Sequence, residues 1–119
     1  MMAKVSAEDV AYGIGLAAGE LSKPCDSNII PSLADCFREW EVIFGSLLSE
    51  IDVDDVKEEN TTGVKKRIAA LRKWRDRKGR EATYKVLVDA LLSRGERYQA
   101  ENLCRKILAH HSMSNKNGK

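Results

Sequence analysis

The sequence has 119 residues, which is enough for one domain and short for two. Hydrophobic residues make up 43% and charged residues 32%, with eight glycines and two prolines, and this composition argues against a collagen-like, low-complexity or disordered chain. The net charge is only +2, so total charge indicates neither a nucleic-acid partner nor a membrane partner.

The cysteines indicate a reducing compartment. Cys25, Cys36 and Cys104 are an odd number and have no C-x-x-C spacing, so we expect three reduced thiols that serve as small apolar residues. No apolar run approaches the roughly 20 residues of a membrane span. Acidic residues precede the stretch 10–19 and no A-x-A cleavage site follows it, which argues against a signal peptide. We therefore expect a cytoplasmic protein without a membrane partner.

Residues 1–30 are expected to form an N-terminal extension with one helix. Apolar residues at helical spacing predict a helix over 6–23, and Ser6 with Asp9 has the spacing of an N-terminal capping box. Internal glycines weaken this helix, and the residue before Pro24 is disfavoured in helical geometry, so the helix should end there.

From residue 31 to about 110, apolar residues recur at spacings of three and four, which predicts six helices. The first is expected over 32–38, the second carries the apolar stripe from Trp40 to Leu48, and the third is acidic. Its apolar side should consist of three residues: Ile51, Val53 and Val56.

The last three helices have clear boundaries. Thr61 or Thr62 can cap the fourth, and Gly79 should end it. Its apolar face is predicted to contain four residues: Val64, Ile68, Leu71 and Trp74. The fifth spans about 82–91 and is closed by Gly95. The apolar residues of the sixth are Tyr98, Leu103, Ile107 and Leu108.

Connections of two to five residues force consecutive helices to pack against each other. We therefore expect an all-α protein in which residues 31–111 form a six-helix antiparallel bundle. Residues 112–119 are polar and are expected to form a disordered tail.

The motifs that could support catalysis lack their structural context. Residues 13–18 spell G-x-G-x-x-A, but no strand precedes them, so we do not expect a dinucleotide site. The two histidines, His110 and His111, are adjacent and point about 100° apart on a helix, which makes them poor joint metal ligands. We expect no enzymatic activity, no catalytic residue, no cofactor, no metal and no small-molecule substrate.

Charge segregation is the most informative pattern. Residues 50–59 contain six acidic residues and one basic residue, a net of −5. Residues 64–80 contain nine basic residues and one acidic residue, a net of +8. The simplest interpretation is that both are solvated helix faces. Like charges in one segment also favour an oppositely charged partner.

Two functional interpretations follow from the charges. In the first, acidic and basic surfaces on different sides of the protein contact other protein molecules and support head-to-tail association. In the alternative, the basic helix binds nucleic acid. We favour the first because Trp74 is the only aromatic residue in the basic segment and its spacing predicts burial, which leaves no base-stacking platform.

The residues between 31 and 108 resemble the death domain family. The run LRKWRDRKGREAT at 71–83, followed by Leu87 and Ala90-Leu91, resembles the family's helix 4 to helix 5 signature. Trp40 with the apolar residues that follow it resembles the spacing of helices 2 and 3, and residues 100–103 resemble helix 6. Residues 1–30 have no counterpart in a minimal death domain. The related caspase-recruitment fold remains an alternative.

The resemblance implies a six-helix Greek-key bundle that acts as a non-enzymatic adaptor. It further implies that the chain assembles apoptotic or inflammatory signalling complexes by binding other death domains, with itself as a further partner. By position, partner contacts would fall on three groups of residues: Asp52, Asp54, Asp55 and Glu58 in helix 3; Arg72, Arg75, Arg77, Lys78 and Arg80 at the end of helix 4 and in the next loop; and Arg94, Glu96 and Arg97 between helices 5 and 6. Trp40 and Trp74 are expected to be core residues.

Overall fold

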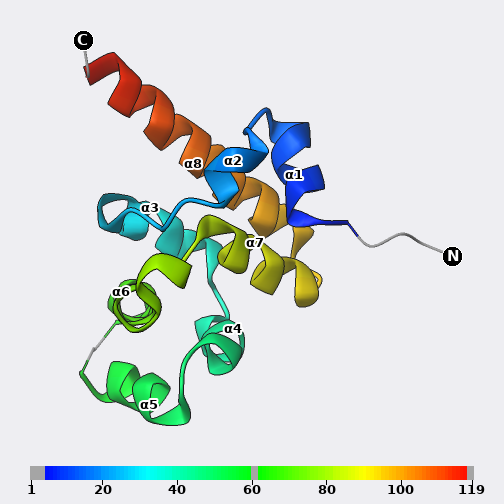
Figure 1. Ribbon diagram of the computed structural model, residues 1–119. Coiled ribbons are helices and arrows are strands. Elements are labelled where there is room, and N and C mark those ends of the chain that lie inside the picture. Colours follow the sequence, from blue (N-terminus) through cyan, green and yellow to red (C-terminus); the bar gives the residue numbers. More distant parts are fainter. Residues whose placement is uncertain (1–4, 60–61, 118–119) are drawn as a thin grey trace, which may run out of the picture. The chain divides into compact units, whose positions relative to one another are not determined.

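The computed structural model describes residues 5–59 and 62–117, with side chains described as far as His111 (Figure 1). Within these residues the regular structure is entirely helical, with eight α-helices, three short 3₁₀ helices and no strand. The expected all-α class is therefore confirmed. The chain divides into two compact units, with boundaries at residues 23/24 and 82/83. We call residues 24–82 the central unit and the remainder the terminal unit, and describe each by itself.

The terminal unit contains four helices: α1 (Ala7–Ile14), α2 (Ala18–Leu21), α7 (Tyr84–Ser93) and α8 (Arg97–Asn117). Ser6 and Asp9 form the expected capping box, in which each side chain accepts a hydrogen bond from the other residue's backbone N–H, at 3.1 and 3.3 Å. Gly15 ends α1 with φ at +93°, a conformation that favours glycine. The single helix predicted over 6–23 is therefore wrong, because the chain turns at Gly15 before α2 begins.

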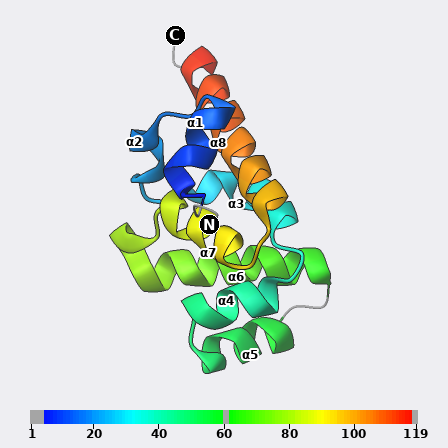
Figure 2. The ribbon, with the colours of Figure 1, turned by 90° about the vertical axis from the view of Figure 1, so that its right-hand side faces the viewer.

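Helix α1 packs against α7 and α8, and α7 packs against α8 (Figures 1 and 2). Buried apolar side chains from these helices form the unit's core, among them Val10, Leu21, Leu87, Leu91, Leu103 and Ile107. Tyr98 was expected on this face but is 70% exposed, so that prediction is wrong. Helix α8 continues through Asn117, into the segment where we expected a tail.

The central unit contains seven elements: η1 (Ser27–Ile29), α3 (Ile30–Leu33), η2 (Ala34–Cys36), α4 (Trp40–Leu47), α5 (Glu50–Glu59), α6 (Gly63–Lys78) and η3 (Gly79–Glu81). The helix predicted over 32–38 is replaced by α3 and η2. Pro31 lies in the first turn of α3, where its missing N–H removes no helical hydrogen bond. Phe37 has a non-helical conformation and ends η2.

Helix α6 is the largest element of the central unit, and α3, α4 and α5 pack against it (Figure 2). Its N-terminus is capped by Thr62, whose hydroxyl accepts the Lys65 N–H at 3.1 Å; Thr61 lies outside the described residues. Trp74 is completely buried and Trp40 is 5% exposed, which confirms both as core residues. Gly79 ends α6 with φ at +56°, as expected.

The apolar sides of α5 and α6 differ from the prediction in detail. Ile51 is 73% exposed and Val64 is 53% exposed, so neither is a core residue. Helix α5 instead buries Val56 together with the charged residue Asp52. This orientation of α5 places a carboxylate against α6.

Hydrogen bonds join the two chain ends of the central unit. The Cys25 N–H donates to the carbonyl oxygen of Ala82 at 2.7 Å. The carbonyl oxygen of Cys25 accepts a hydrogen bond from the Nε of Arg75 on α6. These contacts hold residue 25 beside the C-terminal part of α6.

Candidate protein-interaction surface

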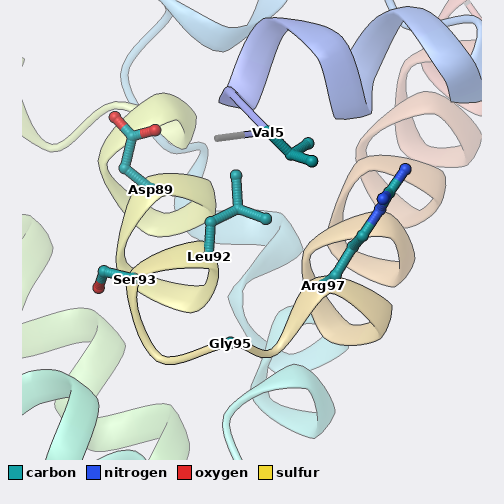
Figure 3. A pocket seen from close by; sticks show the side chains of 6 residues that line it. All are labelled: Val5, Asp89, Leu92, Ser93, Gly95 and Arg97. Carbon is teal, nitrogen blue, oxygen red and sulfur yellow. The ribbon is translucent and has the colours of Figure 1, made fainter. Parts of the chain in front are cut away.

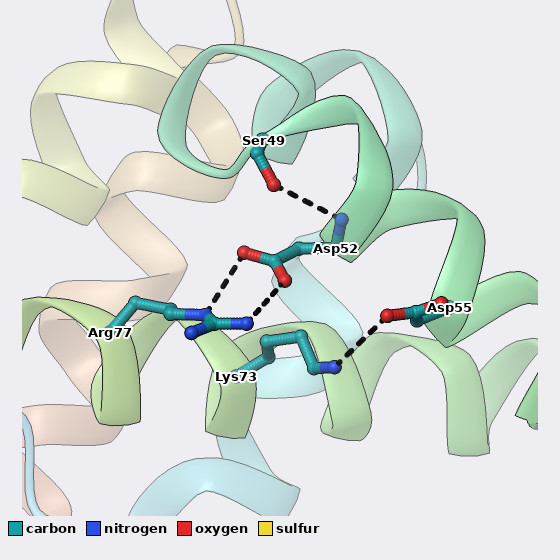
Figure 4. Close-up of polar contacts among 5 residues, drawn as sticks. All are labelled: Ser49, Asp52, Asp55, Lys73 and Arg77. Carbon is teal, nitrogen blue, oxygen red and sulfur yellow. Dashed lines mark hydrogen bonds and ion pairs between the residues drawn. The ribbon is translucent and has the colours of Figure 1, made fainter.

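An ion pair connects the acidic and basic helices of the central unit (Figure 4). Arg77 donates hydrogen bonds from Nε and Nη2 to the two carboxylate oxygens of Asp52, at 3.1 and 2.8 Å. These bonds hold the pKa of Asp52 below its ordinary value and raise the pKa of Arg77. Ser49 accepts the backbone N–H of Asp52 at 3.1 Å and so satisfies one orphan donor at the start of α5.

Two further ion pairs reduce the charge of these helices. Lys73 on α6 lies 3.8 Å from Asp55 on α5, and Lys57 on α5 lies 3.3 Å from Glu41 on α4. The acidic and basic segments therefore lie side by side, and their facing charges compensate each other. Our expectation that they occupy different sides of the protein is wrong for the facing residues.

Several other charged side chains of these helices and of the following loop are exposed to solvent. On α5, Asp54 and Glu58 are exposed and share one helix face with Ile51, at spacings of three and four. Among the basic residues, Arg72 and Lys78 on α6 and Arg80 in η3 are exposed. Within the described part of the chain, none of these three has an ion-pair partner. Five of the nine partner-binding residues predicted in the acidic helix, the basic helix and the following loop are therefore available to a partner: Asp54, Glu58, Arg72, Lys78 and Arg80.

Arg72 lies between two shallow hollows of the central unit. One hollow, of about 320 Å³, is lined by Ser27, Asn28, Ile30, Arg72, Arg75 and Asp76. The other, of about 360 Å³, is lined by Val56, Glu59, Ala69, Arg72, Lys73 and Asp76. Arg75 is only half-exposed, because its Nε is engaged with the Cys25 carbonyl. Arg72 is therefore the more accessible of the two arginines.

The third predicted group lies in the terminal unit, at the turn between α7 and α8. Gly95 forms this turn with φ at +74°. Arg94 is exposed and Glu96 is half-buried, while Arg97 is exposed and donates to Glu101 at 3.2 Å. All three residues flank the turn, as their sequence positions imply.

A hollow of about 460 Å³ adjoins the same turn (Figure 3). It is lined by Val5, Asp89, Leu92, Ser93, Gly95 and Arg97. Sequence reasoning did not find Asp89 or Val5, because a single acid on an amphipathic helix and a single valine before a helix carry no distinctive pattern. Only the folded arrangement brings them together.

Three further observations concern nucleic-acid stacking, metal binding and membrane-spanning helices. Trp74 is 0% exposed, so it offers no surface for stacking nucleic-acid bases. Among residues 5–59 and 62–111, no cluster of three or more His, Cys, Asp or Glu side chains could hold a metal ion. In the part of the chain that the structure describes, no helix combines the length and apolar character needed to cross a membrane.

The death domain family model matches residues 29–108. The chain belongs to the death domain family. This confirms the resemblance seen in the sequence and agrees with the helical structure. Death domains are protein–protein interaction modules that bind other death-domain proteins. Comparison with curated proteins and with solved structures found no match.

Proposed function

We propose that this death domain is a cytoplasmic adaptor that assembles apoptotic or inflammatory signalling complexes. It binds other death domains through asymmetric contacts between basic and acidic surfaces. The observation that carries the proposal is the division of charges in the central unit. Facing charges of α5 and α6 form ion pairs, whereas Arg72, Lys78 and Arg80 are exposed and have no ion-pair partner among the described residues.

The division supports binding because the two sets of charges differ in availability. An arginine already held by a carboxylate gains little from a second acidic residue, whereas an unpaired exposed arginine gains a charge-assisted hydrogen bond in the complex. Arg72 projects between two hollows that a partner side chain can enter. Unpaired surface charge also accelerates association through electrostatic steering.

The acidic side of the proposed contact is smaller than the sequence suggested. Asp52 holds Arg77, and Asp55 lies near Lys73, so Asp54 and Glu58 are the two predicted residues that keep exposed negative charge on α5. Ile51 adds an exposed apolar side chain to the same face. A partner for this face needs basic groups next to an apolar depression.

The test is a charge reversal that preserves the fold. Arg72→Glu should reduce the capture of death domains from a tagged panel by tenfold or more. The unaltered chain should capture them less strongly at high salt than at low salt. Lys65→Glu is a matched control, because Lys65 is exposed on the same helix but lies near its N-terminus, outside the proposed surface. Equal capture by both variants would remove the basic surface from the proposal.

A further inference from the structure

We propose that the hollow between η1 and α6 binds a phosphorylated serine or threonine side chain of a partner protein. The hollow has a volume of about 320 Å³ and lies wholly within the central unit. Four of its lining residues carry hydrogen-bond donors: Ser27 and Asn28 on η1, and Arg72 and Arg75 on α6. The inference rests on the proposed function and deepens it, because it names the chemical group of the partner that Arg72 recognises.

The donors that line this hollow are largely unused by the protein itself. Ser27, Asn28 and Arg72 are exposed, and their side chains form no hydrogen bond or ion pair with any residue that the structure describes. Arg75 is half-exposed, and of the five N–H groups of its guanidinium only the one on Nε is engaged, by the Cys25 carbonyl oxygen. The hollow therefore offers two guanidinium groups, a hydroxyl and a side-chain amide to a ligand.

A phosphate monoester matches these donors better than a carboxylate does. It has three terminal oxygens and a charge of about −1.5 to −2 at neutral pH, whereas a carboxylate has two oxygens that a single guanidinium can fill. Clustered arginines are a recurring means of recognising phosphorylated side chains. The three oxygens of a phosphate can engage Arg72, Arg75 and a neutral donor of η1 at the same time.

Contacts within the central unit hold both sides of the hollow in place. On α6, the Nε of Arg75 donates to the Cys25 carbonyl, and the Cys25 N–H in turn donates to Ala82 at 2.7 Å. On η1, the Asp26 carboxylate accepts the backbone N–H of Asn28 at 2.9 Å and so caps this short helix. Because these groups are already positioned, a ligand loses less of its binding energy to ordering them.

The residues that line the hollow carry a net charge of +1, because Arg72 and Arg75 are positive and Asp76 is negative. Asp76 forms no ion pair with either arginine. Asp26 adjoins the hollow without lining it, and its Oδ1 is engaged in the cap of η1. The positive charge favours an anion, whereas Asp76 opposes one. Removal of the Asp76 charge should therefore strengthen binding.

Retention on immobilised peptides tests this inference. The probe is a mixture of peptides with phosphoserine at the centre and random neighbours, and two parallel mixtures carry serine or glutamate at the same position. The full chain should be retained at least tenfold more strongly on the phosphoserine mixture than on either of the others. Equal retention on the phosphoserine and glutamate mixtures would contradict the inference, because the hollow would then recognise negative charge alone.

Inorganic phosphate distinguishes a phosphorylated partner from a small ligand. It should compete with the phosphoserine peptides for the chain, which would support the assignment of the phosphate group to the hollow. Binding of inorganic phosphate by calorimetry without retention of the phosphoserine mixture would assign the hollow to a small phosphate compound. That result would overturn the protein partner.

Substitutions in the lining should have effects of opposite sign. Arg72→Gln should weaken retention by tenfold or more and Asn28→Ala by about fivefold, whereas Asp76→Asn should strengthen it. Lys65→Gln is the matched control, because it removes one positive charge from an exposed position of the same helix outside the hollow. Circular dichroism of each variant should match that of the unaltered chain. Equal weakening by Lys65→Gln and Arg72→Gln would indicate general electrostatic attraction and overturn the site.

The phosphate site and the proposed function fail separately. If Arg72→Glu loses capture of unphosphorylated death domains and the phosphoserine mixture is not retained, the proposed function stands and the phosphate site is wrong. If the phosphoserine mixture is retained but Arg72→Glu captures unphosphorylated death domains normally, the phosphate site stands and the basic surface is removed from the proposed function.

Discussion

Arg77 on α6 binds both carboxylate oxygens of Asp52 on α5, although the two residues are 25 positions apart in the chain. Asp52 is only 5% exposed, so its charge depends on this contact for compensation. The pair fixes α5 against the basic helix (Figure 4). Asp52 was predicted as a partner-binding residue, and in the structure its carboxylate is occupied by an internal contact.

Removing the Asp52 charge should destabilise the protein. Asp52→Asn leaves Arg77 without its ionised acceptor, and we expect a lower free energy of unfolding in urea titrations. Asp54→Asn, an exposed site two residues away, is the control and should have little effect. In a double-mutant cycle with Arg77→Gln, the two losses should be less than additive. Additive effects would mean that the pair contributes no coupling.

The same pair predicts a pH dependence. Arg77 holds the pKa of Asp52 below its ordinary value, so the folded-state pKa lies below that of the unfolded chain. The resulting stabilisation is complete above the unfolded pKa of about 4 and is lost as the pH falls through the folded pKa. Stability measured from pH 6 to pH 3 should therefore fall more steeply for the unaltered chain than for Asp52→Asn. Parallel curves would contradict this.

Truncation of the central tryptophan should have the largest effect on the fold. Trp74 is completely buried, and Trp74→Ala should lower the free energy of unfolding by about 3–5 kcal/mol. Tyr98 is 70% exposed, so Tyr98→Ala should change stability by only about 0.5 kcal/mol. Chemical denaturation of both variants gives the comparison. Similar losses would show that exposure does not distinguish the two aromatic residues.

Arg75 and Arg72 should respond differently to charge reversal. The Nε of Arg75 donates to the Cys25 carbonyl, so Arg75→Glu should destabilise the protein by about 1–3 kcal/mol in addition to any loss of binding. Arg72 is exposed and makes no such contact with any residue that the structure describes, so Arg72→Glu should leave the thermal unfolding midpoint almost unchanged. A variant that carries both charge reversals would lose stability as well as binding, so it could not separate the two effects. A stable Arg75→Glu variant would show that the Cys25 contact is dispensable.

The cysteines should resist alkylation in the folded protein. Burial raises the pKa of Cys25 to about 12 and that of Cys104 to about 11, and Cys36 is also buried. Because the thiolate is the reactive form, iodoacetamide at pH 8 should label these residues only after unfolding. Mass spectrometry with and without denaturant measures this difference. Rapid labelling of the folded chain would indicate that the thiols are accessible.

Local features of the fold followed from short stretches of sequence. The capping box at Ser6 and Asp9, the cap at Thr62 and the end of α6 at Gly79 all depend on residues within four positions of each other. The same locality explains the error at Gly15. Gly13, Gly15 and Gly19 were all treated as weak points within one helix, whereas the positive φ of Gly15 ends α1 and allows a turn before α2.

By itself, the amino-acid sequence determined that this protein is helical, where most helices begin and end, and that it belongs with the death domains, because helical periodicity, caps and a contiguous motif are properties of neighbouring residues. The tertiary structure alone decided how each helix is rotated about its axis and which distant residues meet. Helix α5 turns Asp52 inward and Ile51 outward, and α7 places Asp89 beside Val5. These orientations depend on all the packing contacts between helices taken together. Because those contacts join residues far apart in the chain, a local sequence pattern does not predict them.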